Sequence, residues 1–255
     1  MQQVSVVIIC KNEADIISKT IASLRGLTDD IVVYDNGSTD ETVLIAREAG
    51  ARVFIGDWEG FGKTKMRANS MAKYEWILSL DADEMIDETL KATLLAMKFE
   101  ENTAYRLQFK NFLGNKQIRY GEWGADSHIR LFNRQQVHWN EEAVHESLVI
   151  PSHIKIKKIQ RGHILHRTMK DLNDYAKKMV HYATLSAQKY YSQGKKASWF
   201  KRTISPCFNF INYYFFRLGF LDGHEGYVCA KMTSHYTFLK YAMLRELWKT
   251  NAAAK

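Results

Sequence analysis

The chain has 255 residues and 46% hydrophobic content, enough for one sizeable core with an appended subdomain. Only two prolines and no low-complexity tract argue against long disordered linkers. The three cysteines, Cys10, Cys207 and Cys229, are odd in number and widely spaced, which indicates free thiols in a reducing compartment. No secretory signal is recognised, because the apolar run 4–10 follows no basic segment.

Charge is divided unevenly between the two parts of the chain. Residues 1–150 carry 17 Lys and Arg against 23 Asp and Glu, a net charge of −6. Residues 151–255 carry 19 against 5, a net charge of +14. A basic region of this kind indicates an anionic partner, and the alternative is a solvated basic helix face.

Short apolar runs rich in Val and Ile alternate with helical patterns in the first part. The apolar runs are 4–9, 30–34, 51–55 and 76–80, and the helical patterns are 13–24, 38–50 and 63–73. The run 38–41 (Ser-Thr-Asp-Glu) is a capping box, and Gly50 marks the end of that helix. The alternation predicts an α/β fold with a parallel sheet, helices on both faces, and ligands at the carboxyl ends of the strands.

The pattern changes after this region. Short strand-like pieces with many aromatic residues begin near Tyr105, and helical spacing begins at Asp171. The aromatic stretch 204–221 contains Pro206 and Arg217, which makes it a poor transmembrane helix. We expect a catalytic domain at 1–168 and a helical, basic, aromatic-rich extension at 169–255.

Two aspartates, Asp81 and Asp83, follow the fourth apolar run directly. Side chains alternate along a strand, so both carboxylates can point to one side where the strand ends. Oxygen ligands of this kind suit Mg²⁺ or Mn²⁺, which would neutralise a diphosphate leaving group. The alternative is a polar turn before a helix whose first acids are Asp87 and Glu88.

Polar residues also close the earlier strands. Asp35 begins a turn, and its carboxylate can accept hydrogen bonds from a nucleotide base or ribose, although a turn-forming role is equally available. The run 60–65 (Gly-Phe-Gly-Lys-Thr-Lys) carries Lys63, with Arg67 one helical turn later. Glycines and cations suit phosphate, but the run does not match the P-loop pattern.

These motifs together resemble the family-two glycosyltransferases of GT-A fold. The resemblance is carried by the runs 4–13, 35–38, 58–67, 78–84, 121–123, 128–133, 144–146 and 219–223. The later runs resemble the bacterial branch that contains lipopolysaccharide-core β-1,4-glucosyltransferases. The likeness extends over nearly the whole chain.

The resemblance implies a role for each matching residue. Asp35, Glu13 and the backbone at Ile9 and Cys10 would form the nucleotide pocket. Asp81 would lie near the ribose and the metal. The metal ligands would be Asp81, Asp83 and, as the third, a histidine, for which the resemblance favours His166 over His163.

The family uses an acidic residue beyond the sheet as general base. The candidates are Glu141, Glu142 and Glu146, and the resemblance favours Glu146 in the run 144–146 (Val-His-Glu), with Glu142 next. Many relatives carry a Glu-Asp pair there, which this chain lacks.

The resemblance implies an inverting enzyme that transfers a hexose, such as glucose, from a nucleotide sugar (a UDP-sugar) to a lipid-linked glycan such as lipopolysaccharide core. Another surface-polysaccharide or lipid-carrier acceptor is the alternative. A basic nucleic-acid-binding protein is the alternative from a different class. The chain carries no nucleic-acid-binding motif, which argues against this alternative, and no nucleic-acid partner is expected. The basic, aromatic segment from Lys195 predicts a cytoplasmic enzyme held peripherally on anionic lipid at the inner membrane.

Overall fold

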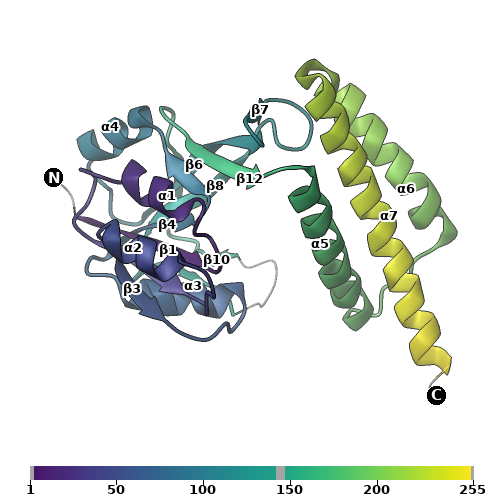
Figure 1. Cartoon of the computed structure of the whole chain (residues 1–255), viewed down its shortest axis with the longest axis horizontal. Coiled ribbons are helices and arrows are strands. Elements are labelled where there is room, and N and C mark those ends of the chain that lie inside the picture. The colour runs from purple at the N-terminus through teal and green to yellow at the C-terminus, as the bar shows by residue number, and fades with distance from the viewer. Residues whose placement is uncertain (1–2, 142–146, 254–255) are drawn as a thin grey trace. The chain divides into compact units, whose positions relative to one another are not determined.

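The computed structural model describes residues 3–141 and 147–253, which form two compact units (Figure 1). The first unit comprises residues 1–109 and 126–166, and the second comprises 110–125 and 167–255. The chain therefore passes into the second unit twice. The predicted division into a domain at 1–168 and an extension at 169–255 stays a prediction.

A parallel sheet lies at the centre of the first unit. Its strands are β1 (Val4–Cys10), β2 (Ile31–Asp35), β3 (Arg52–Ile55) and β4 (Trp76–Asp81), in the order β3-β2-β1-β4. Antiparallel β8 (Ser127–Asn133) continues the sheet beside β4. The mainly parallel sheet with flanking helices confirms the fold class expected from the alternating pattern.

The remaining strands extend this sheet beyond β8, apart from one pair that forms a sheet of its own. They are β6 (Thr103–Leu113), β12 (Ile164–Met169) and β5 (Glu84–Ile86) along the main path, β7 (Lys116–Ile118) and β11 (Lys155–Lys158) beside β6, and a separate pair, β9 (His138–Trp139) with β10 (Leu148–Val149). Antiparallel pairing of β12 with β5 sets His166 opposite Glu84. The end of β4 and a histidine far along the chain thereby become neighbours.

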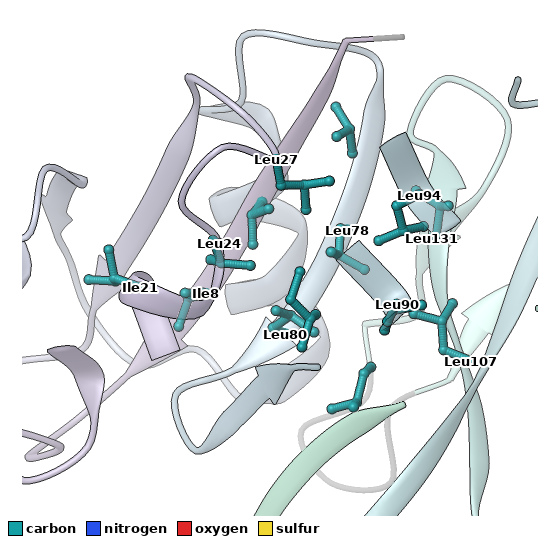
Figure 2. Close-up of a cluster of buried hydrophobic side chains, with 14 of the residues drawn as sticks. Ile8, Ile21, Leu24, Leu27, Leu78, Leu80, Leu90, Leu94, Leu107 and Leu131 are labelled. Carbon is teal, nitrogen blue, oxygen red and sulfur yellow. The ribbon is translucent and has the colours of Figure 1, made fainter. Parts of the chain in front are cut away.

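Alternation along β1 divides the core between the two faces of the sheet. Val6 and Ile8 pack with α1 (Ile17–Ser23), α2 (Thr42–Glu48) and α4 (Glu88–Ala96), as Figure 2 shows for part of this cluster. Val7 and Ile9 face the other cluster, which includes residues of α3 (Phe61–Ser70). Because both faces are covered, every residue of β1 is buried, as its continuous apolar run predicted.

The predicted capping box at 38–41 is wrong. Helix α2 begins at Thr42, and Glu41 at its N-cap makes no side-chain hydrogen bond. Ser38 Oγ instead accepts the N–H of Asn12, and Asp40 Oδ1 accepts the N–H of Thr42. The polar run is used to join the ends of β1 and β2, a tertiary contact that local capping rules do not include.

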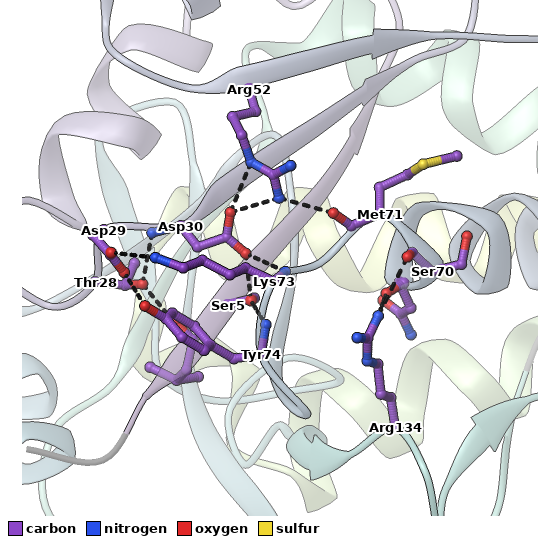
Figure 3. A network of polar contacts seen from close by, with 12 residues as sticks. Ser5, Thr28, Asp29, Asp30, Arg52, Ser70, Met71, Lys73, Tyr74 and Arg134 are labelled. Atoms are coloured by element: carbon purple, nitrogen blue, oxygen red, sulfur yellow. Dashed lines mark hydrogen bonds and ion pairs between the residues drawn. The ribbon is translucent and has the colours of Figure 1, made fainter.

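Asp30 organises a polar network at the amino ends of the strands (Figure 3). It is 1% exposed, and its carboxylate accepts hydrogen bonds from Ser5 Oγ, from Arg52 Nε and Nη2 at 2.9 and 2.7 Å, and from the Lys73 N–H at 2.7 Å. A buried carboxylate needs such partners to offset its desolvation. Because ligands bind at the opposite, carboxyl ends, we assign this network to folding.

Three helices make up most of the second unit: α5 (Leu172–Ser192), α6 (Trp199–Ile211) and α7 (His224–Ala253). A π-helical turn, Asn212–Phe216, and a 3-10 turn, Gly219–Asp222, join α6 to α7. Asp171 caps α5 by accepting the N–H of Asp174, which confirms the helix expected from Asp171 onward. None of the described helices is long and apolar enough to cross a membrane.

The glycine-bearing run 219–223 is used for packing inside this unit. Asp222 Oδ2 accepts the N–H groups of Arg119 and Tyr120, both at 2.8 Å. A Cβ at Gly226 would lie 1.9 Å from the carbonyl oxygen of Gly219. The close approach of these backbones therefore requires glycine at position 226.

Gly226→Ala is expected to destabilise the protein by about 3 kcal/mol, because the methyl group overpacks a backbone contact. Thermal unfolding of the variant measures the loss. Lys249→Ala, at an exposed position of the same helix, serves as the control and should change stability by less than about 0.5 kcal/mol. Equal stability of the two variants would contradict the packing role.

Candidate active site

Asp81, at the carboxyl end of β4, lies between two cations. Lys65 Nζ, from α3, is 3.2 Å from Oδ1, and Arg130 Nη2, from β8, is 2.9 Å from Oδ2. The Lys65 side chain is only 4% exposed, whereas that of Asp81 is 35% exposed. Burial alone would raise the pKa of Asp81, but Lys65 and Arg130 more than offset it and hold the pKa below its ordinary value.

Glu84 is a further member of this group of charged side chains. Its side chain is fully buried, one carboxylate oxygen accepts a hydrogen bond from Arg130 Nη2, and the other accepts the Asp81 N–H at 3.1 Å. Burial raises the pKa of Glu84 to about 7, with Arg130 opposing the rise and the charge of Asp81 adding to it. Arg130 thus holds two acidic side chains in one place.

Asp83 and His166 approach each other beside this group, with Asp83 Oδ2 3.6 Å from His166 Nε2. Burial lowers the pKa of His166, but its hydrogen bond to Asp83 and the surrounding carboxylates raise the pKa above its usual value. The structure thereby brings together a carboxylate and an imidazole predicted as metal ligands.

The donor set can be tested against a divalent cation. Among the residues in 3–141 and 147–253, no three His, Cys, Asp or Glu side chains form a group suited to a metal ion. Asp81 is held by Lys65 and Arg130, so Asp83 and His166 remain as a pair. Mg²⁺ is commonly bound through one or two carboxylates and completes its shell with substrate phosphates and water, so the Asp83 carboxylate, with His166 beside it, fits a cation delivered with a diphosphate.

The residues predicted for the nucleotide pocket lie at the ends of β1 and β2. Asp35 is 1% exposed, and its Oδ2 accepts the N–H groups of Gly37 and Ser38 at 3.0 and 2.9 Å. The Cys10 thiol lies 3.6 Å from the other oxygen, and burial raises the pKa of this thiol. Ile9 pairs with both Tyr34 and Asp81, so the backbone of β1 links this turn to the carboxylate site.

Glu13 and the predicted phosphate-binding cations lie around these strand ends. The Glu13 N–H donates to Thr42 Oγ1 at 2.8 Å. Lys63 Nζ lies 3.4 Å from Glu141, and Arg67 Nη1 lies 3.3 Å from Glu59, all four side chains being well exposed. Sequence reasoning thus selected the exposed cations of α3 and missed Lys65, which contacts Asp81.

Arg130 was also missed, although the run 128–133 was singled out. The available signal was an arginine followed by apolar residues in a strand, because a buried arginine requires a carboxylate partner. The two leading candidates for the general base, Glu142 and Glu146, lie outside the described residues.

A cavity of about 430 Å³ opens beside Asp81. Its lining includes Lys65, Arg106, Arg130, Trp139 and Leu148. Trp139 is 6% exposed and packs against Phe132, and Lys65 Nζ lies 4.7 Å from the centre of its ring. The cavity therefore combines a cationic wall with an aromatic one, a combination suited to a negatively charged, sugar-bearing ligand.

Arg130→Leu is expected to destabilise the protein by about 4 kcal/mol, because it leaves the fully buried Glu84 without its cation. Urea denaturation measures the loss. The double variant Arg130→Leu, Glu84→Leu should recover most of it, since two apolar groups can replace a buried pair. If the double variant is as unstable as the single one, the ion pair does not account for the effect.

Comparison with known proteins identifies the family of this chain. The sequence profile of "Glycosyl transferase family 2" matches residues 5–153. An uncharacterized glycosyltransferase of Rickettsia typhi is 30% identical over 257 residues, covering 97% of this chain and 88% of that protein. The lipopolysaccharide core biosynthesis glycosyltransferase LpsC of Rhizobium meliloti is 27% identical, covering 94% of this chain and 91% of LpsC.

Among solved structures, a glucosyl-3-phosphoglycerate synthase of Mycobacterium tuberculosis in complex with Mn²⁺, uridine diphosphate and glucosyl-3-phosphoglycerate is 26% identical, with a TM-score of 0.32. The alignment covers 45% of this chain and 45% of that structure, so the chain spans less than half of it. The family profile covers more than half of the chain and includes β1 from its second residue, β4, Asp81, Asp83 and Arg130. This chain therefore belongs to glycosyl transferase family 2.

Proposed function

We propose that this protein is an inverting, metal-dependent glycosyltransferase that moves a hexose, such as glucose, from a UDP-sugar to a hydroxyl of a lipid-linked glycan, with lipopolysaccharide core as the acceptor. The observation that carries the proposal is the pairing of Asp83 with His166 beside the Lys65–Asp81–Arg130 group at the end of β4. The similarity to LpsC along most of both chains supports the acceptor class.

Each residue of the site would have a distinct role in the reaction. Asp83 and His166 would hold Mg²⁺ or Mn²⁺, which supplies Lewis-acid stabilisation of the departing diphosphate. Asp81 would lie near the ribose and the metal. Lys65 and Arg130 add positive charge at the same edge, where it stabilises negative charge that develops as the sugar–phosphate bond breaks.

The nucleotide and the acceptor would lie on either side of the transferred sugar. Ile9, Cys10, Glu13 and Asp35 would surround the base and ribose. Lys63 and Arg67 would approach the phosphates. Glu146, or Glu142 in its place, would remove the proton from the acceptor hydroxyl as it attacks the anomeric carbon, so a single displacement inverts the configuration.

A screen of donors tests this function. The protein is incubated with UDP-, GDP- and dTDP-sugars and deacylated lipopolysaccharide core, and the product linkage is read by NMR. We expect transfer from an α-linked UDP-hexose to give a β-linkage. A retained linkage, or no transfer from any donor, would overturn the proposal. A transfer only to another lipid-carrier glycan would replace the acceptor with the alternative one.

We also propose that the enzyme lies peripherally on the cytoplasmic face of the inner membrane, where a lipid-linked acceptor is found. The support is the net charge of +14 in residues 151–255. Cations near an anionic bilayer contribute about 1 kcal/mol each. Replacing Lys195, Lys196, Lys201 and Arg202 with Gln should therefore reduce flotation with anionic liposomes, and equal flotation of the variant would contradict this location.

A further inference from the structure

Helix α6 carries its apolar side chains on the outside. Its outer face and the following π-helical turn present five large apolar residues at intervals of three or four, each between 38% and 60% exposed. These residues, named here the α6 ridge, are Phe200, Ile204, Phe208, Ile211 and Phe215. A helix on the surface of a globular protein normally places such residues inward.

The opposite face of α6 is occupied by α7, which explains why the ridge faces away. Asn209 Nδ2 donates to Thr237 Oγ1 at 2.7 Å, and Ser234 Oγ donates to the Pro206 carbonyl oxygen at 2.8 Å. Phe210 lies against Tyr227, with ring centres 5.9 Å apart. These contacts with α7 come from Asn209, Pro206 and Phe210, none of which belongs to the ridge.

The apolar surface continues past the end of the ridge. Phe216 is 75% exposed, and the turn that follows exposes Leu218, Phe220 and Leu221. Leu218 has a φ of +57°, a left-handed conformation that a branched side chain rarely adopts. The fold thus holds this leucine 43% exposed at a backbone cost.

Charge along the segment that contains the ridge has a single sign. No Asp or Glu occurs between Asp174 and Asp222, a stretch that contains eight Lys and Arg residues. Residues 203–216, which contain most of the ridge, carry no charge at all. Cations therefore flank an uncharged apolar surface at both ends, with Lys201 and Arg202 before it and Arg217 after it.

We infer that the α6 ridge is inserted into the headgroup region of an anionic lipid bilayer, with the flanking cations on lipid phosphates. An apolar face bordered by Lys and Arg is the pattern of helices that lie in the plane of a membrane interface. The inference rests on the proposed membrane location and adds its contact surface. It predicts penetration by aromatic side chains, which binding through surface lysines alone does not require.

Cys207 offers a direct test, because it lies on the exposed side of α6 between Ile204 and Phe208, whereas Cys10 and Cys229 are buried. The full chain is labelled at Cys207 with a polarity-sensitive thiol fluorophore. It is mixed with vesicles of phosphatidylcholine, with or without phosphatidylglycerol. We expect a blue shift of emission with phosphatidylglycerol vesicles, and a much smaller shift with neutral vesicles or at high salt.

Two matched double variants distinguish vesicle binding through the ridge from nonspecific hydrophobic binding. Phe208→Ser with Phe215→Ser should weaken vesicle binding by about tenfold or more, because two apolar side chains lose their burial in lipid. Leu44→Ser with Ile55→Ser removes two side chains of similar exposure, 55% and 62%, from the first unit and should leave binding unchanged. Circular dichroism checks that both variants keep their helix content.

Three results would overturn the inference. Vesicle binding without a blue shift would place the contact on the lysines alone. A blue shift that grows with protein concentration in the absence of lipid would assign the ridge to a second copy of this chain. Equal binding of the two variant pairs would exclude the ridge. Because no donor or acceptor is present, each result is independent of whether sugar transfer has been assigned correctly.

Discussion

Asp83→Ala is expected to abolish sugar transfer, with a fall in turnover of about 1,000-fold or more, while the protein remains folded. The physical reason is that Asp83 provides the carboxylate of the Asp83–His166 pair, so its loss leaves an imidazole that binds a hard cation poorly by itself. Without the cation, the leaving diphosphate loses its main charge stabilisation. Steady-state transfer from the preferred UDP-sugar measures the effect.

Asp87→Ala is the matched control for this experiment. Asp87 belongs to the same acidic segment but caps α4 by accepting the Leu90 N–H at 2.7 Å. Its loss should cost about 1 kcal/mol of stability and leave turnover near that of the original protein. Chelation with EDTA should abolish sugar transfer by the original enzyme, and added Mg²⁺ or Mn²⁺ should restore the activity. Full activity of Asp83→Ala, or indifference to EDTA, would remove the metal from the mechanism.

Both interpretations of the segment around Asp81 describe part of the structure. Asp87 is a helix cap, as the simpler interpretation required, and Asp81 and Asp83 lie before that helix at the end of a buried strand. The strand was predictable because its apolar run is continuous. The partners of Asp81 were not, since Lys65 and Arg130 are distant in sequence and meet Asp81 only when α3 and β8 pack beside β4.

The same limit explains why Lys65 was not singled out beside Lys63. Lys63 and Lys65 are both basic residues of one glycine-bearing run, and local reasoning favoured Lys63 because Arg67 lies one turn away. In the folded chain α3 turns Lys65 toward the sheet and leaves Lys63 exposed. Which face of a helix packs inward depends on the sheet it covers, so spacing within the helix alone did not identify the buried cation.

The helices of the second unit were predictable from the sequence, but which of their side chains are exposed was not. Asp171 and the spacing of Tyr175 and Ser186 indicated α5, and both of the latter are buried. The aromatic residues after Lys195 could equally have filled a core. Only the packing of α6 on α7 through Asn209 and Thr237 leaves Phe208 outside.

Glu146→Gln is expected to lower turnover by roughly 100-fold or more while the affinity for the donor is retained. Glutamine keeps the shape of the side chain but cannot accept the proton of the acceptor hydroxyl. Turnover with saturating acceptor measures the first effect, and calorimetric titration with the UDP-sugar measures the second. A loss confined to turnover is the signature of a group that acts in the transition state.

Glu142→Gln and Glu141→Gln are the comparisons that make this test decisive. Glu141 is 75% exposed at its side chain and lies 3.4 Å from Lys63, so its substitution removes a weak surface pair and should leave turnover nearly unchanged. Glu142 and Glu146 are four residues apart in the sequence, and the resemblance alone places Glu146 first. If Glu142→Gln is inactive and Glu146→Gln transfers sugar normally, the proton is removed by Glu142, and the match between this chain and the family motif is displaced by four residues.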